Sequence, residues 1–239
     1  MNNYYSNKIV YKPWGYEYVI YCDSNLLAIT FLKINYGHKT SLHCHPEKKT
    51  GFIILEGKAQ VQIGIYKENI KHFNSLSRLV FRPGLFHSIK ANSKNGVYAL
   101  EFETPYKKRD LVRLTDNYGR QQKKYEGKKF TKKLTYKDIK FKRPKLNNKN
   151  LYKFNNLDIE IETRKDLKNL SKNDSSSTAA ILKGNILNNK GKKVISYGEI
   201  VKSSTLRILS NKFYIKKPIT ILNVKKNKNT KIKNYKLIK

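Results

Sequence analysis

The chain has 239 residues, of which 38% are apolar, and it carries a formal net charge of +34. This length is enough for one large or two small domains with a buried core. No apolar run approaches the roughly 18 residues of a membrane-spanning helix, residues 1–9 have no apolar signal-peptide segment, and two cysteines cannot make a disulfide framework. We therefore expect a cytoplasmic protein with free thiols. A membrane-spanning chain, a collagen, a coiled coil and a disulfide scaffold are excluded.

The positive charge is concentrated in the second half of the chain. Residues 121–239 contain 33 of the 51 basic residues and 8 of the 17 acidic ones. Clustered lysines suit a nucleic-acid partner, because they release counterions from phosphate backbones. The sequence is also rich in Lys, Asn, Ile and Tyr, whose codons are rich in A and T, and a biased genome explains the charge without a partner. We expect nucleic acid to be an unlikely partner, and an anionic small substrate or a lipid surface remains open.

Short apolar or alternating segments follow one another through the first half, with little helical periodicity. The expected strands are residues 16–21, 26–34, 51–55, 59–65, 79–81, 87–91 and 97–102. Many short strands separated by turn residues are typical of an antiparallel sandwich or barrel. Residues 1–120 are therefore predicted to form one all-β domain.

Residues 121–149 interrupt this pattern with a strongly basic segment. We interpret it as a linker with one strand around residues 134–141. Its aromatic residues, Tyr125, Phe130, Tyr136 and Phe141, could stack on bases. We expect instead that they hold the linker against its own domain.

Strand patterns return after the linker, at residues 157–163, 178–187, 193–195, 205–208 and 219–224. Residues 150–225 are therefore predicted to form a second, smaller β-domain, which contains no His and no Cys. Residues 226–239 are predicted to be a flexible basic tail.

All five histidines lie between residues 38 and 87, and three of them have an informative spacing. His43 and His45 are two residues apart, so on a strand both imidazoles point to the same face, away from Cys44. His87 follows a Pro-Gly turn at the start of another expected strand. A pair of imidazoles and a third from a distant strand form a typical metal site.

The same residues resemble the two sequence motifs of the cupin superfamily. Gly37, His43, His45 and Gly57 have the spacing of the first motif. Residues 82–87 (RPGLFH), with Asn92 nearby, resemble the second. The resemblance implies an antiparallel β-barrel of the cupin or jelly-roll type over residues 10–120. The glutamate that usually completes the cupin metal site is replaced by Thr50.

Two further segments resemble the type II mannose-6-phosphate isomerase cupin domain. Residues 12–17 (KPWGYE) look like its opening, and residues 110–120 (DLVRLTDNYGR) look like its end. This resemblance implies a phosphorylated or nucleotide-linked sugar as substrate, an isomerase or epimerase reaction, and a role in surface-polysaccharide synthesis. It covers half of the chain.

The second half is interpreted as a degenerate repeat of the first. Residues 180–186 (AILKGNI) echo residues 54–59 (ILEGKA) at a strand-Gly-strand turn, and residues 197–200 (YGEI) look like the turn before a second motif. The fold is thus predicted to be two tandem lobes, a bicupin with one active site. Cupins often pair through their sheets, so a homodimer is possible.

Each part of the site has candidate residues. The metal ligands are His43, His45 and His87; the catalytic bases are Glu47 and Glu101; and the substrate-binding residues are Lys49, Arg82, Arg113 and Trp14. Three imidazoles can hold Zn²⁺ with a water even without the usual glutamate, so we expect a divalent metal, with zinc favoured over iron. They could also act without a metal, as an acid–base pair. The alternatives are an iron-dependent dioxygenase and a non-enzymatic sugar-binding cupin.

Overall fold

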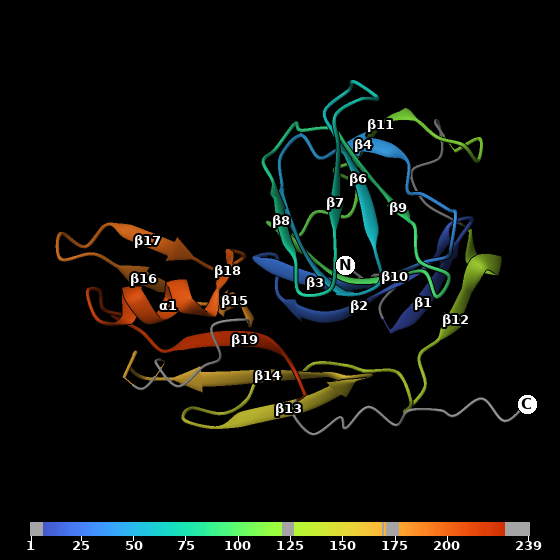
Figure 1. The fold of residues 1–239 in the computed structure, drawn as a ribbon. Helices are drawn as coiled ribbons and strands as arrows, with labels where there is room; N and C mark the ends of the chain where they lie inside the picture. The colour runs from blue at the N-terminus through green and yellow to red at the C-terminus, as the bar shows by residue number, and fades with distance from the viewer. Residues whose placement is uncertain (1–6, 121–126, 169, 171–176, 228–239) are drawn as a thin grey trace, which may run out of the picture.

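The computed structural model of the chain describes residues 7–120, 127–168, 170 and 177–227. Two lobes are visible in Figure 1, a β-barrel built from the first half of the chain and a smaller β-rich lobe built from the second half. Among the described residues, no helix has the length and apolar content needed to cross a bilayer.

The barrel is made of two facing antiparallel sheets. One sheet has the order β12-β1-β2-β3-β10-β5-β8, and the other has the order β11-β4-β9-β6-β7. The strands are β1 (Lys8–Lys12), β2 (Gly15–Asp23), β3 (Leu27–Ile34), β4 (Leu42–Cys44), β5 (Lys49–Glu56), β6 (Ala59–Ile63), β7 (Ile70–Phe73), β8 (Arg78–Phe81), β9 (His87–Ala91), β10 (Val97–Thr104), β11 (Val112–Thr115) and β12 (Thr131–Lys133). The eight strands from β3 to β10 are shared between the sheets in the order of a jelly roll. The predicted all-β antiparallel barrel is confirmed.

Side chains on the seven-stranded sheet alternate between two buried faces. On β10, Leu100 and Phe102 point out of the barrel, whereas Glu101 and Glu103 point into it. The same alternation on β3 and β5 gives strands that are apolar on one face and mixed on the other. This sheet is therefore covered on both sides.

The second lobe covers the outer face of that sheet. Its five-stranded sheet has the order β13-β14-β19-β15-β18, with β13 (Lys149–Phe154), β14 (Leu157–Arg164), β15 (Thr178–Lys183), β18 (Ile200–Lys202) and β19 (Ile219–Lys226). Residues of both lobes form one continuous hydrophobic core, which includes Phe31 and Phe102 from the barrel and Ile159 and Leu222 from the second lobe. The lobes are therefore joined by a packed core and not by the linker alone.

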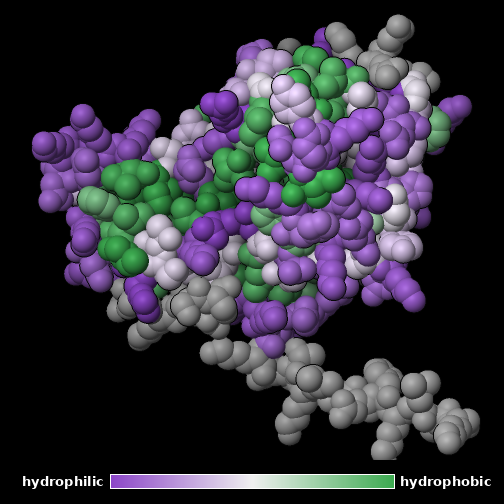
Figure 2. All heavy atoms as spheres, turned by 45° about the horizontal axis from the view of Figure 1, so that its top comes forward, coloured by the Kyte–Doolittle hydropathy of each residue, from purple (hydrophilic) through white to green (hydrophobic). Residues whose placement is uncertain are grey.

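The far face of the five-stranded sheet has a smaller cover. It consists of the hairpin β16 (Asn185–Leu187) and β17 (Lys193–Ser196) together with helix α1 (Ser203–Ser210). In Figure 2, hydrophobic residues gather on the second lobe and where it meets the barrel, whereas hydrophilic residues cover most of the rest of that view. The division of the chain at residues 120 and 150, and the origin of the second lobe as a repeat, stay predictions.

Two expected strands differ from the structure. Residues 205–208 lie in α1 and not in a strand, because Leu206 is buried in the smaller core and Leu209, three residues on, packs against it as on one face of a helix. The expected strand at residues 134–141 is also wrong. Pairing with β1 involves Thr131–Lys133 instead, and the following residues form turns.

The basic segment between the lobes is partly held by its aromatic residues. Phe141 is buried in the core that joins the two lobes, as predicted. Phe130 and Tyr136 are exposed. Tyr125 lies outside the described residues.

Candidate metal centre

Three imidazoles meet inside the barrel on the five-stranded sheet that contains β4 and β9. His43 on β4 and His87 on β9 are directly opposite each other in the ladder, and His45 is the first residue after β4. The ring centroid of His43 is 4.7 Å from that of His87 and 5.0 Å from that of His45. One nitrogen from each of the three rings lies within 4.8 Å of the others. The predicted trio is thus brought together as a possible metal-binding cluster.

Hydrogen bonds to the main chain fix the tautomer of each ring. The Nδ1 of His43 lies 2.8 Å from the carbonyl oxygen of Ser41, and the Nδ1 of His87 lies 3.0 Å from that of Leu85. His45 Nδ1 makes the same contact with the carbonyl oxygen of Asp110. A carbonyl oxygen only accepts, so each Nδ1 carries the proton and each Nε2 keeps its lone pair.

The Nε2 atoms have the surroundings expected of metal ligands. Those of His45 and His87 are buried and have no hydrogen-bond partner among the described residues. A buried polar atom without a partner is costly, and a bound cation removes that cost. The cluster therefore fits a divalent metal ion.

Burial keeps the three rings neutral. Together with the charge of Lys48, burial lowers the pKa of His87 to about 4 and that of His45 to about 3. Burial also lowers the pKa of His43 well below its usual value, with His87 and His45 adding to the effect. Neutral imidazole is the form that binds metal, so the cluster needs no deprotonation at neutral pH.

A cavity of about 100 Å³ lies between the two sheets, with the histidines on one wall. Three of the predicted site residues, Trp14, Glu101 and Arg113, also line it. Arg113 is directly opposite His43 in the β4–β11 pair, so both side chains point to the same face. Phe81 stacks on the His87 ring, with centroids 4.1 Å apart and planes 4° from parallel, and so fixes its orientation.

Two carboxyl groups on β10 form the wall opposite the histidines, and they differ in charge state. Glu103 is buried and ion-paired with Lys48, and it accepts a hydrogen bond from the Thr30 hydroxyl at 3.3 Å. Burial opposes ionisation of Glu103, but the charges of Lys48 and Lys108 outweigh it and lower its pKa. For Glu101, burial and the charge of Glu103 raise the pKa. One group is therefore a carboxylate and the other holds a proton at neutral pH.

Thr50 stands at the position where the cupin motif has its glutamate. It is directly opposite Glu103 in the β5–β10 pair, and its buried hydroxyl has no hydrogen-bond partner among the described residues. The neighbouring strand thus places a carboxylate beside the position from which the motif carboxylate is missing.

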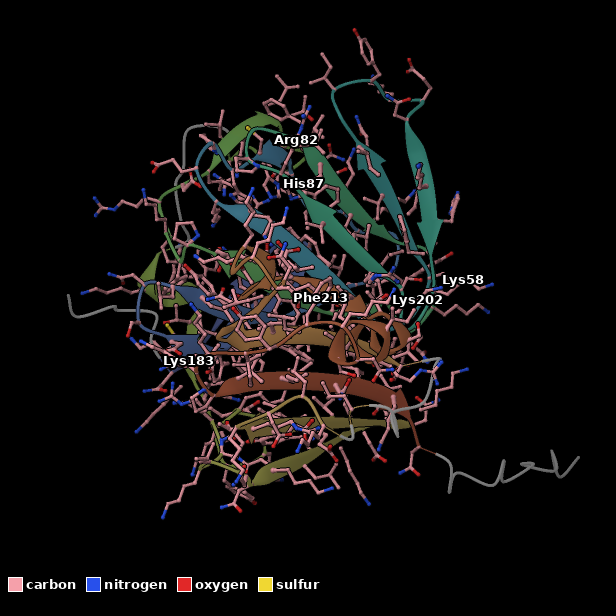
Figure 3. The ribbon with its side chains drawn as sticks, turned by 90° about the vertical axis from the view of Figure 1, so that its left-hand side faces the viewer. Lys58, Arg82, His87, Lys183, Lys202 and Phe213 are labelled. Atoms are coloured by element: carbon pink, nitrogen blue, oxygen red, sulfur yellow. The ribbon has the colours of Figure 1, made fainter. Side chains whose placement is uncertain are left out.

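Three other candidates are not among the residues that line the cavity. Glu47 is exposed and pairs with the exposed Lys107. Lys49 points to the second lobe, where it pairs with Glu199. Arg82 is exposed in the turn after β8. Figure 3 shows Arg82 and His87 in the barrel, away from Lys202 and Phe213 of the second lobe.

Sequence reasoning missed several residues of the cavity. Lys48, Glu103, Glu17, Lys12, Lys108 and Arg120 all line it. The signal for Glu103 was present, because a side chain two positions from Glu101 on a strand points to the same face of the sheet. Lys48 gave no signal, since it lies in a turn among other lysines.

The sequence matches no family model and no curated protein. Solved structures that resemble part of the chain include an uncharacterised conserved protein with a double-stranded beta-helix domain from Klebsiella pneumoniae, at 14% identity over 42% of this chain and 84% of that chain, with a TM-score of 0.38. The cupin domain of Cnp3 from Schizosaccharomyces pombe is 15% identical over 38% of this chain and 64% of that chain, with a TM-score of 0.35. A sugar phosphate isomerase of the cupin superfamily from Silicibacter pomeroyi is 14% identical over 34% of this chain and 52% of that chain, with a TM-score of 0.31.

Proteins described as cupins are thus among the structures that this chain resembles, as the two motifs predict. At such low identity and TM-score the likeness carries no argument about activity. The assignment of the jelly roll rests on the strand order itself.

Proposed function

We propose that the protein is a metal-dependent enzyme that acts on a phosphorylated or nucleotide-linked sugar, by an isomerase or epimerase type of reaction. The observation that carries this proposal is the cluster of three histidines facing the carboxyl groups of Glu101 and Glu103 across one cavity. A role in surface-polysaccharide synthesis is part of the proposal and rests on the sequence resemblance alone.

Each reacting part of the proposed site has a residue in the cavity. His43, His45 and His87 would hold the metal, which when bound supplies a Lewis acid for a carbonyl or hydroxyl oxygen of the sugar. Glu101 would move the proton between neighbouring carbons in the fraction of molecules in which it is ionised, because its raised pKa makes its carboxylate a stronger base than an ordinary one. Arg113 would bind the anionic group, since its planar guanidinium suits phosphate.

The remaining candidates have weaker support. Trp14 is buried and lines the cavity, so it would form a wall against the sugar ring. Glu47, Lys49 and Arg82 lie outside the cavity, and only Arg82, which follows β8 and precedes His87, stays a candidate for the anionic group at the entrance.

Elemental analysis of the purified protein, prepared without chelator or added metal, tests the metal centre. We expect about one equivalent of metal in the wild type and in His72→Ala, whose exposed imidazole lies on β7 away from the cluster. We expect none in His45→Ala. A wild type without metal that also fails to take up Zn²⁺ or Fe²⁺ would refute the proposal.

The metal that is found selects the next assay. Zinc leads to assays of aldose–ketose interconversion with sugar phosphates, in which Glu101→Gln should lose turnover but keep the metal. Iron with oxygen uptake would favour the dioxygenase alternative, for which three histidine ligands also suffice. Sugar binding without turnover would favour the non-enzymatic alternative.

A further inference from the structure

We infer that Asp110 is a positioning residue of the histidine cluster, which holds His45 and Lys48 in place at the same time. The inference rests on the proposed metal-binding role of the histidines. It concerns a residue outside the cavity lining, in the segment between β10 and β11.

Asp110 uses both its main chain and its side chain. Its carbonyl oxygen accepts a hydrogen bond from His45 Nδ1. Its carboxylate accepts from the main-chain nitrogen of Lys48 at 2.9 Å and from that of Glu47 at 3.2 Å to each oxygen. The residue is only 9% exposed, so these are buried contacts.

The turn at residues 45–48 depends on such contacts, because β4 ends at Cys44 and β5 begins at Lys49. The turn is also held by a hydrogen bond from the main-chain nitrogen of Gly84 to the carbonyl oxygen of His45, at 2.8 Å. Hydrogen bonds to a carboxylate are stronger than those to neutral acceptors. The Asp110 carboxylate therefore fixes the path of this turn. Its main-chain carbonyl fixes the orientation of the His45 ring, which the turn carries.

The same turn reaches the opposite wall of the cavity. The Lys48 ammonium pairs with Glu103 on β10 and donates to the carbonyl oxygen of Lys107 at 3.3 Å. Lys107 lies three residues before Asp110. The turn at residues 45–48 is therefore bound to the segment at residues 107–110 at both ends of that segment. Loss of the Asp110 carboxylate would thus misplace a ligand ring and a buried ion pair together.

Substitution of Asp110 by Asn tests this role. The variant keeps the carbonyl oxygen and the shape, but its amide nitrogen cannot accept a bond from the main chain. Zn²⁺ titration of the full-length protein against a chromophoric chelator should give an affinity about ten- to a hundredfold weaker than in the wild type, the usual effect of losing an outer-shell partner.

Asp116→Asn, directly after β11, is the matched control. Its carboxylate accepts hydrogen bonds from the main chain and the guanidinium of Arg120, at 2.8 Å and 2.7 Å, whereas His45 is held by Asp110. We expect its Zn²⁺ affinity to stay within about threefold of the wild type. Equal affinities for all three proteins, or an equal loss in both variants, would overturn the inference.

A second measurement does not depend on whether Asp110→Asn folds. Imidazole ¹⁵N spectra of the metal-free wild type, assigned by comparison with His45→Gln, should show His45 protonated on Nδ1. A proton on Nε2 would overturn the inference. Neither readout uses turnover, so a protein that binds Zn²⁺ but isomerises no sugar would refute the proposed reaction and leave the role of Asp110 standing. A wild type that binds no Zn²⁺ would refute both.

Discussion

The ion pair between Lys48 and Glu103 lies in the barrel interior, with side chains only 3% and 5% exposed. Burying two charges costs free energy that their attraction offsets only while both are present. Removal of one partner leaves the other charge buried and alone. The pair is therefore a point where single and double substitutions should differ.

Lys48→Met is expected to lower the free energy of unfolding by about 3–5 kcal/mol, the usual result of removing one partner of a buried pair. The double variant Lys48→Met/Glu103→Leu should lose much less. Lys49→Met is the neighbouring control, because its partner Glu199 is partly exposed and such pairs contribute about 0–1 kcal/mol. Urea denaturation measures all three, and a double variant as unstable as Lys48→Met would contradict the argument.

The stability of the protein should depend on pH through Glu101. Burial and the charge of Glu103 raise its pKa to about 8. The folded protein therefore binds this proton more tightly than the unfolded chain does, and the stability that it confers is lost as the pH rises toward 8. Glu101→Gln has no such proton, so its stability relative to the wild type should increase between pH 5 and pH 9.

Urea denaturation of both proteins at pH 5, 7 and 9 measures this difference. The lowered pKa values of His45 and His87 act in the opposite direction below neutral pH, but they act in both proteins and cancel in the comparison. A difference that stays constant with pH would mean that Glu101 ionises normally.

Among the strands, β18 is packed closely against the barrel through the turn that precedes it. Gly198 in that turn has φ of +80°, and a Cβ atom there would lie 2.1 Å from the hydroxyl of Thr104 at the end of β10. Its main-chain nitrogen also donates to Ile181 on β15. The turn therefore needs glycine for its conformation and for the contact between the lobes.

Gly198→Ala should destabilise the protein by more than Gly191→Ala does. Gly191 also has a positive φ, +73°, but the nearest atom to its added Cβ is 3.9 Å away. The strain at a positive φ costs about 1–3 kcal/mol at either position, so any excess at Gly198 measures the contact with Thr104. Equal melting temperatures for the two variants would show that the turn can move away from the barrel.

The expected strands were recognisable from the sequence where polar and apolar residues alternate or where β-branched residues gather, as in β2, β6 and β9. The histidine cluster could also be predicted, because its spacing has a direct meaning on paired strands. Helix α1 could not, since Leu206 and Ile208 alternate with polar residues as in a strand, and four residues are too few to show the helical period. Lys48, Asp110 and Glu103 form their contacts between segments more than 50 residues apart, and no local pattern encodes such contacts.

For the chain as a whole, the cover that the second lobe gives to the barrel is the main feature that the sequence did not predict. The sequence suggested a second domain after a linker, but the two halves share one core. Composition and alternation show that a strand has an apolar face. They do not show which surface covers it.

A fragment of residues 1–148 should therefore be unstable as a monomer. It would expose the outer face of the seven-stranded sheet, including Phe31 and Phe102, and apolar faces of that kind cause association. We expect the fragment to aggregate or to form oligomers in analytical ultracentrifugation, whereas the full chain does not associate through this face. A monomeric fragment with the melting temperature of the full chain would contradict this expectation.

The central position of the seven-stranded sheet also has a consequence for its slowest motions. Strands β3, β5 and β10 are shielded by the facing sheet on one side and by the second lobe on the other. Their main-chain amides can reach solvent only when both layers separate, which requires nearly complete unfolding. Deuterium should therefore enter these three strands last, and Glu101 is carried by a backbone that opens no more often than the whole molecule does.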